Sequence, residues 1–172
     1  VFASAATISV GAWVLPVYEI YKVGQDVHSL PGLDFFSDFG VPLSFIPHWN
    51  NTDGGDDLDT SRCFIGMERF AQWCDPLPSD HTIVGLDEHT GLILDFEKSE
   101  CVVSGVSSVS LVRECSPEIY ASGKIFPLTG LGNFKMPALE DGISSAALEL
   151  IRNAMPVGKE SPDAGVLSLL EA

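Results

Sequence analysis

Apolar residues along the chain fall into two kinds of run, which predict two kinds of element. The stretches 41–47 and 82–86 are apolar at nearly every position, as expected for strands covered on both faces of a sheet. Between them, over residues 63–74, apolar residues recur at spacings of three and four. This spacing predicts an amphipathic helix, with Asp59 or Thr60 placed to cap its start.

The second half of the chain predicts further strands and one more helix. Residues 91–96 read as a β run that follows 82–86 after a short turn, so we expect these two segments to form a hairpin. Residues 101–105 and 109–113 predict two more strands of an antiparallel edge. Helical spacing of apolar residues then predicts a final helix over 144–155.

Strands that alternate with helices predict a single α/β domain. The sequence contains no internal repeat and no Pro/Gly linker long enough to divide the chain. We expect a domain over residues 1–155, followed by a loosely held tail over 156–172. The chain begins at Val1 without a methionine or a basic leader, so we expect it to have been processed or cut from a longer protein.

The charge of the chain argues against some partners. Nine Lys and Arg residues stand against 24 Asp and Glu residues, which gives a net charge of −15. Phosphate binding needs clustered basic side chains, so nucleic acid is not an expected partner. Anionic membrane surfaces are disfavoured for the same reason, and no stretch approaches eighteen uninterrupted apolar residues. We expect a soluble protein, and the sequence leaves a homodimer open.

The four cysteines, at positions 63, 74, 101 and 115, match neither a CxxC redox pair nor a zinc knuckle. We therefore expect reduced, partly buried thiols. The Asn-Asn-Thr triplet at 50–52 has the form of a glycosylation sequon, but no secretory signal accompanies it. Together these features predict a cytoplasmic protein.

Three polar clusters lie where predicted strands end, which is where sites gather in open α/β sheets. Ser4 stands among small residues at a predicted strand-to-helix turn, as a nucleophile elbow requires, although such a serine is more often a cap or a small core residue. His48 directly follows a buried strand, and the Asp-Glu-His-Thr cluster at 87–90 follows another. A metal site built from His48, Asp87, His89 and the acidic loop over 50–59 fits no standard zinc or EF-hand spacing, so we predict none. No cofactor is predicted either.

The order of these clusters resembles the peptidase E and cyanophycinase branch of the class I glutamine amidotransferase-like proteins. The Ala-Ser-Ala-Ala segment at 3–6 resembles a degenerate form of the Gly-x-Ser-Ala-Gly-Ala elbow of that branch. The Pro-His-Trp-Asn-Asn segment at 47–51 resembles the histidine segment of peptidase E. An arginine, Arg62, follows the histidine by fourteen positions as it does in the family. The Gly-Leu-Asp-Glu-His-Thr-Gly-Leu segment at 85–92 resembles a cyanophycinase motif.

The resemblance implies both a fold and an incomplete chain. It runs from about residue 4 to about residue 137 and is similar to a bacterial subgroup described only as amidotransferase-like. It implies a three-layer, flavodoxin-like sheet with an antiparallel β edge over 91–113. The family domain begins with strands upstream of its elbow, so the resemblance also implies that the N-terminal part of the domain is missing here.

The resemblance implies a serine hydrolase that cleaves a peptide or amide bond. Ser4 would attack the carbonyl, His48 would accept and return the proton, and Glu19 would orient the imidazole, because an acidic residue fifteen positions after the serine matches peptidase E. Asp26 or Asp87 could take the place of Glu19. The backbone N–H of Ala5 would bind the oxyanion.

Substrate binding and two competing function classes complete the expectations. Arg62 is the candidate for a substrate carboxylate, with Asn50 and Asp87 as further substrate-binding residues. Phe2 stands where the family elbow has glycine, and a bulky residue there could spoil the turn. This favours the alternative of a catalytically inactive relative that binds a small metabolite in the same pocket. An amidotransferase subunit would need a cysteine in place of Ser4.

Overall fold

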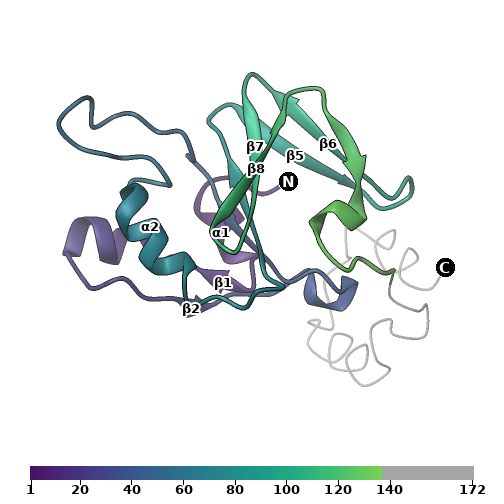
Figure 1. The fold of residues 1–172 in the computed structure, drawn as a ribbon, viewed down its shortest axis with the longest axis horizontal. Coiled ribbons are helices and arrows are strands. Elements are labelled where there is room, and N and C mark those ends of the chain that lie inside the picture. Colours follow the sequence, from purple (N-terminus) through teal and green to yellow (C-terminus); the bar gives the residue numbers. More distant parts are fainter. Residues whose placement is uncertain (137–172) are drawn as a thin grey trace, which may run out of the picture. The chain divides into compact units, whose positions relative to one another are not determined.

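The structure is a computed structural model, and it describes residues 1–136. Its largest sheet has the strand order β3-β4-β7-β8, from β3 (Leu43–Ile46), β4 (Thr82–Leu86), β7 (Ser108–Arg113) and β8 (Ser116–Ala121). β3 and β4 are parallel, and the other neighbours are antiparallel. Figure 1 labels β7 and β8 of this sheet.

A second sheet of three antiparallel strands has the order β5-β6-β9, from β5 (Thr90–Asp95), β6 (Glu100–Gly105) and β9 (Ile125–Pro127). A small two-stranded sheet pairs β1 (Trp13–Val14) with β2 (Leu30–Pro31). The helices are α1 (Ala5–Ser9), α2 (Gly66–Cys74), the π-helix η1 (Glu19–Val23) and the 3-10 helices η2 (Ser37–Phe39) and η3 (Leu128–Leu131).

The large sheet carries a core on each face. On one face Ile46 and Ile83 pack with Phe70 and Trp73 of α2. On the other face Val84 of β4 joins a cluster that includes side chains of the second sheet. Adjacent residues of one strand, such as Ile83 and Val84, thus enter opposite cores, which explains why these strands are apolar at nearly every position.

The described residues confirm a mixed α/β fold. The predicted strands 41–47, 82–86, 101–105 and 109–113 correspond to β3, β4, β6 and β7 within one or two residues. A flavodoxin-like fold has helices on both faces of its sheet, whereas within residues 1–136 the cluster on the second face joins the second sheet and the short 3-10 helices η2 and η3, and it contains no residue of α1 or α2. The flavodoxin-like form therefore stays a prediction. The predicted helix over 144–155 and the tail over 156–172 lie outside the described residues.

The predicted hairpin between 82–86 and 91–96 is wrong. β4 pairs with β3 and β7, while β5 pairs with β6, so the two segments belong to different sheets. The turn between them contains His89 with a positive φ of 56°, and the Asp87 carboxylate is hydrogen-bonded to Ser107 and Ser108. The chain therefore leaves one sheet at this turn and enters the other.

The predicted helix over 63–74 begins later than its apolar spacing indicates. Residues Arg62, Cys63 and Phe64 have φ values of 57°, 61° and 71°, in the left-handed region, so α2 starts only at Gly66. Asp59 was a predicted cap, and its carboxylate does accept the backbone N–H of Met67 at 2.8 Å. Hydrogen bonds from Ser61, which are the largest cause, and from the backbone of Met67 lower the pKa of Asp59.

The prediction of four reduced cysteines is wrong for one pair. Cys74 at the end of α2 and Cys115 in the turn between β7 and β8 form a disulfide, with 5.9 Å between their Cα atoms. Cys63 and Cys101 are free and buried, as expected. Disulfides are typical of oxidising compartments, so the cytoplasmic location stays a prediction that this bridge does not favour. Among residues 1–136, no helix has the length and apolar character needed to cross a membrane.

Candidate active site

Ser4 lies at the start of α1 in a strained backbone conformation. Its φ is 50° and its ψ is −123°, a region that residues with a side chain rarely adopt. A sharp turn of this kind presents a serine hydroxyl at the edge of a sheet, as in a nucleophile elbow. Phe2, two residues before Ser4, packs edge-to-face on Phe35 with 6.0 Å between the rings. The bulky residue is thus accommodated beside the turn.

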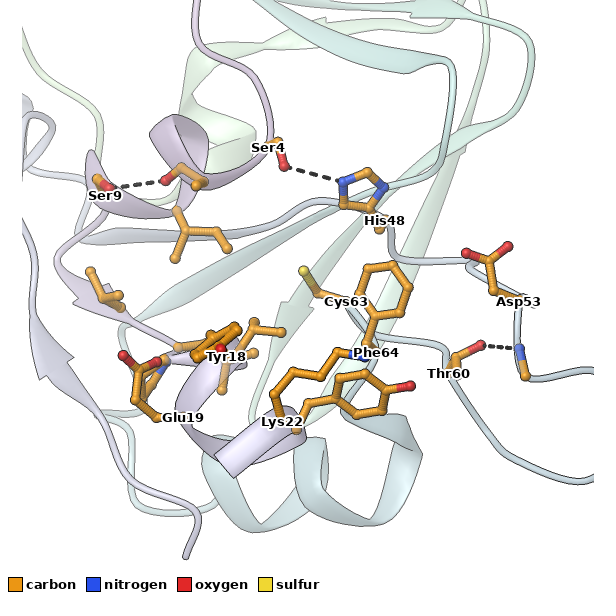
Figure 2. Close-up of a pocket in the computed structure, with 18 of the residues that line it drawn as sticks. Ser4, Ser9, Tyr18, Glu19, Lys22, His48, Asp53, Thr60, Cys63 and Phe64 are labelled. Carbon is orange, nitrogen blue, oxygen red and sulfur yellow. Dashed lines mark hydrogen bonds between the residues drawn. The ribbon is translucent and has the colours of Figure 1, made fainter. Parts of the chain in front are cut away.

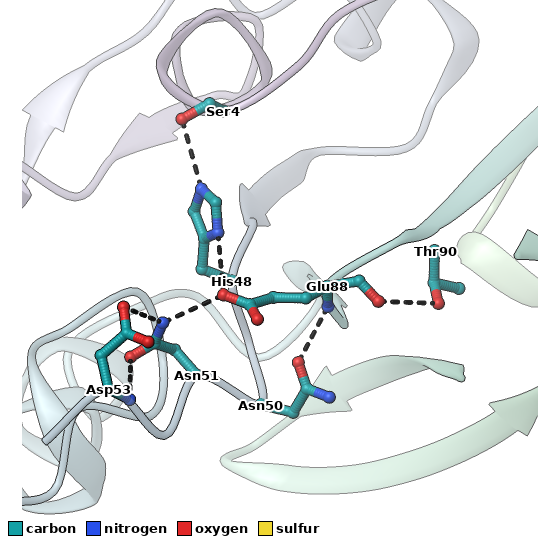
Figure 3. A network of polar contacts seen from close by, with 7 residues as sticks. All are labelled: Ser4, His48, Asn50, Asn51, Asp53, Glu88 and Thr90. Atoms are coloured by element: carbon teal, nitrogen blue, oxygen red, sulfur yellow. Dashed lines mark hydrogen bonds and ion pairs between the residues drawn. The ribbon is translucent and has the colours of Figure 1, made fainter. Parts of the chain in front are cut away.

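His48 links Ser4 to an acidic residue. The Ser4 hydroxyl lies 3.3 Å from Nε2 of His48, and Nδ1 of His48 lies 3.3 Å from Oε1 of Glu88. Figure 3 shows the three side chains in line. The side chains of His48 and Glu88 are 35% and 37% exposed, so a substrate can reach the imidazole.

The parallel pairing of β3 and β4 brings His48 and Glu88 together. His48 follows β3 and Glu88 follows β4, and the carboxyl ends of parallel neighbours meet at one edge. The backbone N–H of Trp49 donates to the carbonyl of Leu86 at 3.0 Å, which extends this pairing. Gly85 allows the Trp49 ring to lie close to the backbone of β4, because a Cβ at Gly85 would lie 2.4 Å from that ring.

Two asparagines fix Glu88. The side-chain nitrogen of Asn51 donates to Oε1 of Glu88 at 3.0 Å, and Oδ1 of Asn50 accepts the Glu88 backbone N–H at 2.8 Å. Asn51 also donates to Asp53. Asn50, predicted to bind substrate, therefore holds the acidic residue. The same motif contained Asn51, but spacing alone gave it no role.

Glu19, the predicted acidic partner of His48, lies elsewhere. It lines the same cavity, but within residues 1–136 no hydrogen bond or ion pair joins it to His48, and Figure 2 shows the two on opposite sides of the cavity. Asp26 contributes its backbone carbonyl to His28. The carboxylate beside His48 in this structure is therefore that of Glu88, and a catalytic role of Glu19 stays a prediction that this geometry does not favour.

Asp87 is buried and holds the turn between β4 and β5 through hydrogen bonds. Its Oδ2 accepts hydrogen bonds from the hydroxyls of Ser107 and Ser108, each at 2.6 Å, and from the backbone N–H of Ser108 at 3.1 Å. Asp87 does not line the cavity beside Ser4. The residue predicted to bind substrate thus fixes the turn that carries Glu88.

Arg62, predicted to bind a substrate carboxylate, packs against the protein. Its guanidinium carbon lies 3.9 Å from the centre of a Trp49 ring, and Nη1 donates to the Trp49 carbonyl at 2.9 Å. Burial is the main cause that lowers its pKa. Arg62 is not among the residues that line the cavity beside Ser4.

The cavity beside Ser4 has a volume of about 870 Å³. Its charged lining residues and histidine are Glu19, Lys22, His48 and Asp53, and Tyr18, Tyr21 and Cys63 also line it. Burial raises the pKa of the Cys63 thiol to about 12, so this cysteine is protonated near neutral pH and is a poor nucleophile. Within residues 1–136, no three His, Cys, Asp or Glu side chains are grouped so that they could hold a metal ion.

Ala5 is placed next to the nucleophile. It is the first residue of α1, and no acceptor for its backbone N–H is found within residues 1–136. The N–H after an elbow serine is a usual oxyanion donor. Together, the groups at this edge can move a proton from Ser4 to His48 and hold a developing negative charge.

Comparisons with known proteins add one distant likeness. No family model matches the chain, and no curated protein matches it. One solved structure that is similar is the crystal structure of a peptidase from an acI-B1 Actinobacterium, with 18% sequence identity and a TM-score of 0.49. The likeness covers 72% of this chain and 43% of that one, so the chain spans less than half the length of that peptidase.

Proposed function

We propose that this chain is a serine hydrolase that cleaves a peptide or amide bond through Ser4, His48 and Glu88. The observation that carries the proposal is the continuous contact from the Ser4 hydroxyl to Nε2 of His48 and from Nδ1 to Glu88. A strained serine, a histidine and a fixed carboxylate in this order are the elements of a catalytic triad. The motif resemblance to the peptidase E and cyanophycinase branch, and to its flavodoxin-like fold, agrees with this function.

The two contacts of 3.3 Å are long for hydrogen bonds but suit a site without substrate. Catalytic hydrogen bonds are often long or poorly aligned before substrate binds, and they shorten in the complex. The Asn51 contact keeps the Glu88 carboxylate beside the imidazole. Little rearrangement is therefore needed to bring the three side chains into working geometry.

The reaction proceeds in two halves. Ser4 Oγ forms a bond to the carbonyl carbon, its proton passes to Nε2 of His48, and the carbonyl oxygen takes up the negative charge beside the Ala5 N–H. The carbon–nitrogen bond then breaks as His48 returns the proton to the leaving amine. Water attacks the resulting ester with His48 as base, which releases the acid and restores Ser4. Glu88 stabilises the imidazolium in both halves.

A fluorophosphonate probe tests this proposal directly. We expect the mass of the full chain to increase by one adduct, and we expect no increase for Ser4→Ala. His48→Gln should slow labelling by about a hundredfold or more, because the base is lost. Thermal unfolding of each variant shows whether it is folded. A folded wild-type chain without an adduct, or an adduct that persists in Ser4→Ala, would contradict the proposal.

A further inference from the structure

Part of the wall of the cavity beside Ser4 is built from the hydrophobic core. Ile8, Leu15 and Cys63 line the cavity and belong to the buried cluster beneath the large sheet, at 8%, 2% and 4% exposure. Val17 and Phe64 line it too and pack against the same cluster. A group bound beside Ser4 therefore meets aliphatic, aromatic and thiol surface, where an unpaired charge would be costly.

Phe64 connects this apolar wall to the imidazole. Its ring centre lies 5.8 Å from that of His48 and 5.8 Å from that of Tyr21, which also lines the cavity. In Figure 2, Phe64 and Cys63 lie between Ser4 and Lys22. If the carbonyl carbon of a substrate lies at Ser4, a substituent on that carbon that extends into the cavity passes along the Phe64 ring.

The backbone holds Phe64 in this place. Three successive residues, Arg62, Cys63 and Phe64, have left-handed φ values, and none of them is glycine. The N–H of Cys63 donates to the carbonyl of His48 at 3.1 Å. Backbone strain of this kind persists only where surrounding contacts enforce it, and it clusters at functional sites. The left-handed turn and this hydrogen bond therefore fix the position of Phe64 relative to His48.

Positive charge is scarce along the cavity beside Ser4. Lys22 is the one Lys or Arg among the residues that line it within the described chain. Its Nζ lies 4.6 Å from the centre of the Tyr21 ring, and in Figure 2 the Lys22 side chain extends toward Phe64. Arg62, the other candidate, holds Trp49. A carboxylate beside the scissile carbonyl would thus have Lys22 as its single possible Lys or Arg partner in the described lining, and in Figure 2 Phe64 and Cys63 lie between Ser4 and Lys22.

We infer that the subsite beside Ser4 binds an uncharged, apolar acyl group, with Phe64 as its specificity-determining wall. This inference rests on the proposed function, since it assigns the acyl side of the same hydrolytic site. It replaces the expectation of a carboxylate held by Arg62. The substrate class is thus an amide or peptide whose carbonyl side carries an aliphatic or aromatic group of several carbons.

Matched phosphonate probes separate the two possibilities. We would measure the rate at which Ser4 is labelled by p-nitrophenyl phosphonates that carry either a 3-methylbutyl group or its close isostere, the 2-carboxyethyl group, each corrected for spontaneous hydrolysis of the probe. We expect the 3-methylbutyl probe to label at least about tenfold faster, since apolar pockets discriminate by such factors. Equal rates, or faster labelling by the carboxylate probe, would overturn the inference while leaving the hydrolase proposal intact. No labelling by either probe or by fluorophosphonate would instead overturn the proposed function.

Phe64→Ala tests the role of the wall, and Phe96→Ala is its matched control, because Phe96 packs in the other core cluster. The ratio of the two labelling rates is independent of how much of each variant is folded. We expect this ratio to fall severalfold in Phe64→Ala and to stay unchanged in Phe96→Ala. An unchanged ratio in Phe64→Ala would remove Phe64 from the subsite. The wild-type ratio tests the inference by itself if that variant does not fold.

Discussion

Two histidine–serine pairs in this molecule have opposite surroundings. His48 lies 3.3 Å from the strained Ser4, borders a cavity and contacts Glu88. His81 lies 3.0 Å from Ser44, and both residues are buried, at 3% and 0% exposure. The shorter distance thus belongs to the pair that substrate cannot reach. Proximity of a serine to a histidine is therefore insufficient evidence for a nucleophile.

The direction of the hydrogen bonds separates the pairs further. The Ser44 hydroxyl donates to the carbonyl of Trp13 at 2.7 Å and accepts the Trp13 N–H at 3.1 Å. With its proton used in this way, Ser44 can only accept from Nε2 of His81. His48 has the reverse arrangement, because an acidic partner at Nδ1 leaves Nε2 free to accept from Ser4. Only the second arrangement makes the imidazole a base.

Alanine at the two serines should give the largest contrast. We expect Ser4→Ala to lower hydrolysis by roughly 10⁴-fold or more without loss of stability, because the nucleophile is removed. Ser44→Ala should keep the chemistry of the folded chain but lower the free energy of unfolding by about 1–3 kcal/mol, because buried partners lose their hydrogen bonds. Hydrolysis assays and denaturant unfolding of both variants check this. If Ser4→Ala and Ser44→Ala lost the same activity per folded molecule, the two serines would not differ in catalytic role.

The two glutamates of the cavity region form the next comparison. Glu88→Gln should reduce hydrolysis by up to roughly 10⁴-fold, because the carboxylate that holds the imidazole tautomer is lost. Glu19→Gln is the same isosteric substitution. Its hydrolysis rate should stay within about threefold of the wild type, since no hydrogen bond or ion pair joins Glu19 to His48 in residues 1–136. Steady-state rates of the two variants decide between them. A larger loss in Glu19→Gln would return the acidic role to that residue.

The disulfide should support the scaffold and leave the site unchanged. Replacing Cys74 and Cys115 by alanine should lower the free energy of unfolding by about 2–4 kcal/mol, since the bridge closes a long loop. Neither cysteine lines the cavity beside Ser4, so labelling of Ser4 in the folded variant should match the wild type. Reductant should destabilise the wild type but have no effect on the double variant. Equal sensitivity of both proteins would contradict this.

A smaller effect is expected from His81 as the pH falls. Burial is the main cause that lowers its pKa in the folded chain, while Asp80 and Asp34 oppose the shift. Below about pH 6.5 the unfolded chain then binds a proton that the folded chain does not, so stability decreases as the pH falls. Unfolding curves from pH 7.5 to 5 should show this decrease, and His81→Gln should reduce it. Identical pH profiles would show that His81 titrates alike in both states.

The sequence predicted most of the large sheet, and the structure places two of the predicted site residues, Ser4 and His48, 3.3 Å apart. Continuous apolar runs located β3 and β4, because both of their faces are buried. β8 was missed because its side chains are almost all exposed, which leaves no apolar alternation to detect. The Cys74–Cys115 bridge joins positions 41 residues apart, a separation that indicates no pairing by itself.

Placing the acidic residue needed three-dimensional information. The sequence placed a cluster at 87–90 at the end of a strand and considered Asp87, but which of two adjacent carboxylates faces His48 depends on the turn. There Asp87 is directed at Ser107 and Ser108, and Glu88 is directed at the imidazole. Arg62 was predicted to bind a substrate carboxylate because it follows His48 by fourteen positions, but a left-handed turn directs its side chain over Trp49.

The most direct test of the proton relay is the tautomer of the two imidazoles, read by ¹⁵N NMR of the ring nitrogens above pH 7. Assignment comes from His48→Gln and His81→Gln. We predict that neutral His48 carries its proton on Nδ1, toward Glu88, and that His81 carries its proton on Nε2, toward Ser44. A proton on Nε2 of His48 would make the imidazole a donor to Ser4, and this would contradict its role as the base that activates the serine.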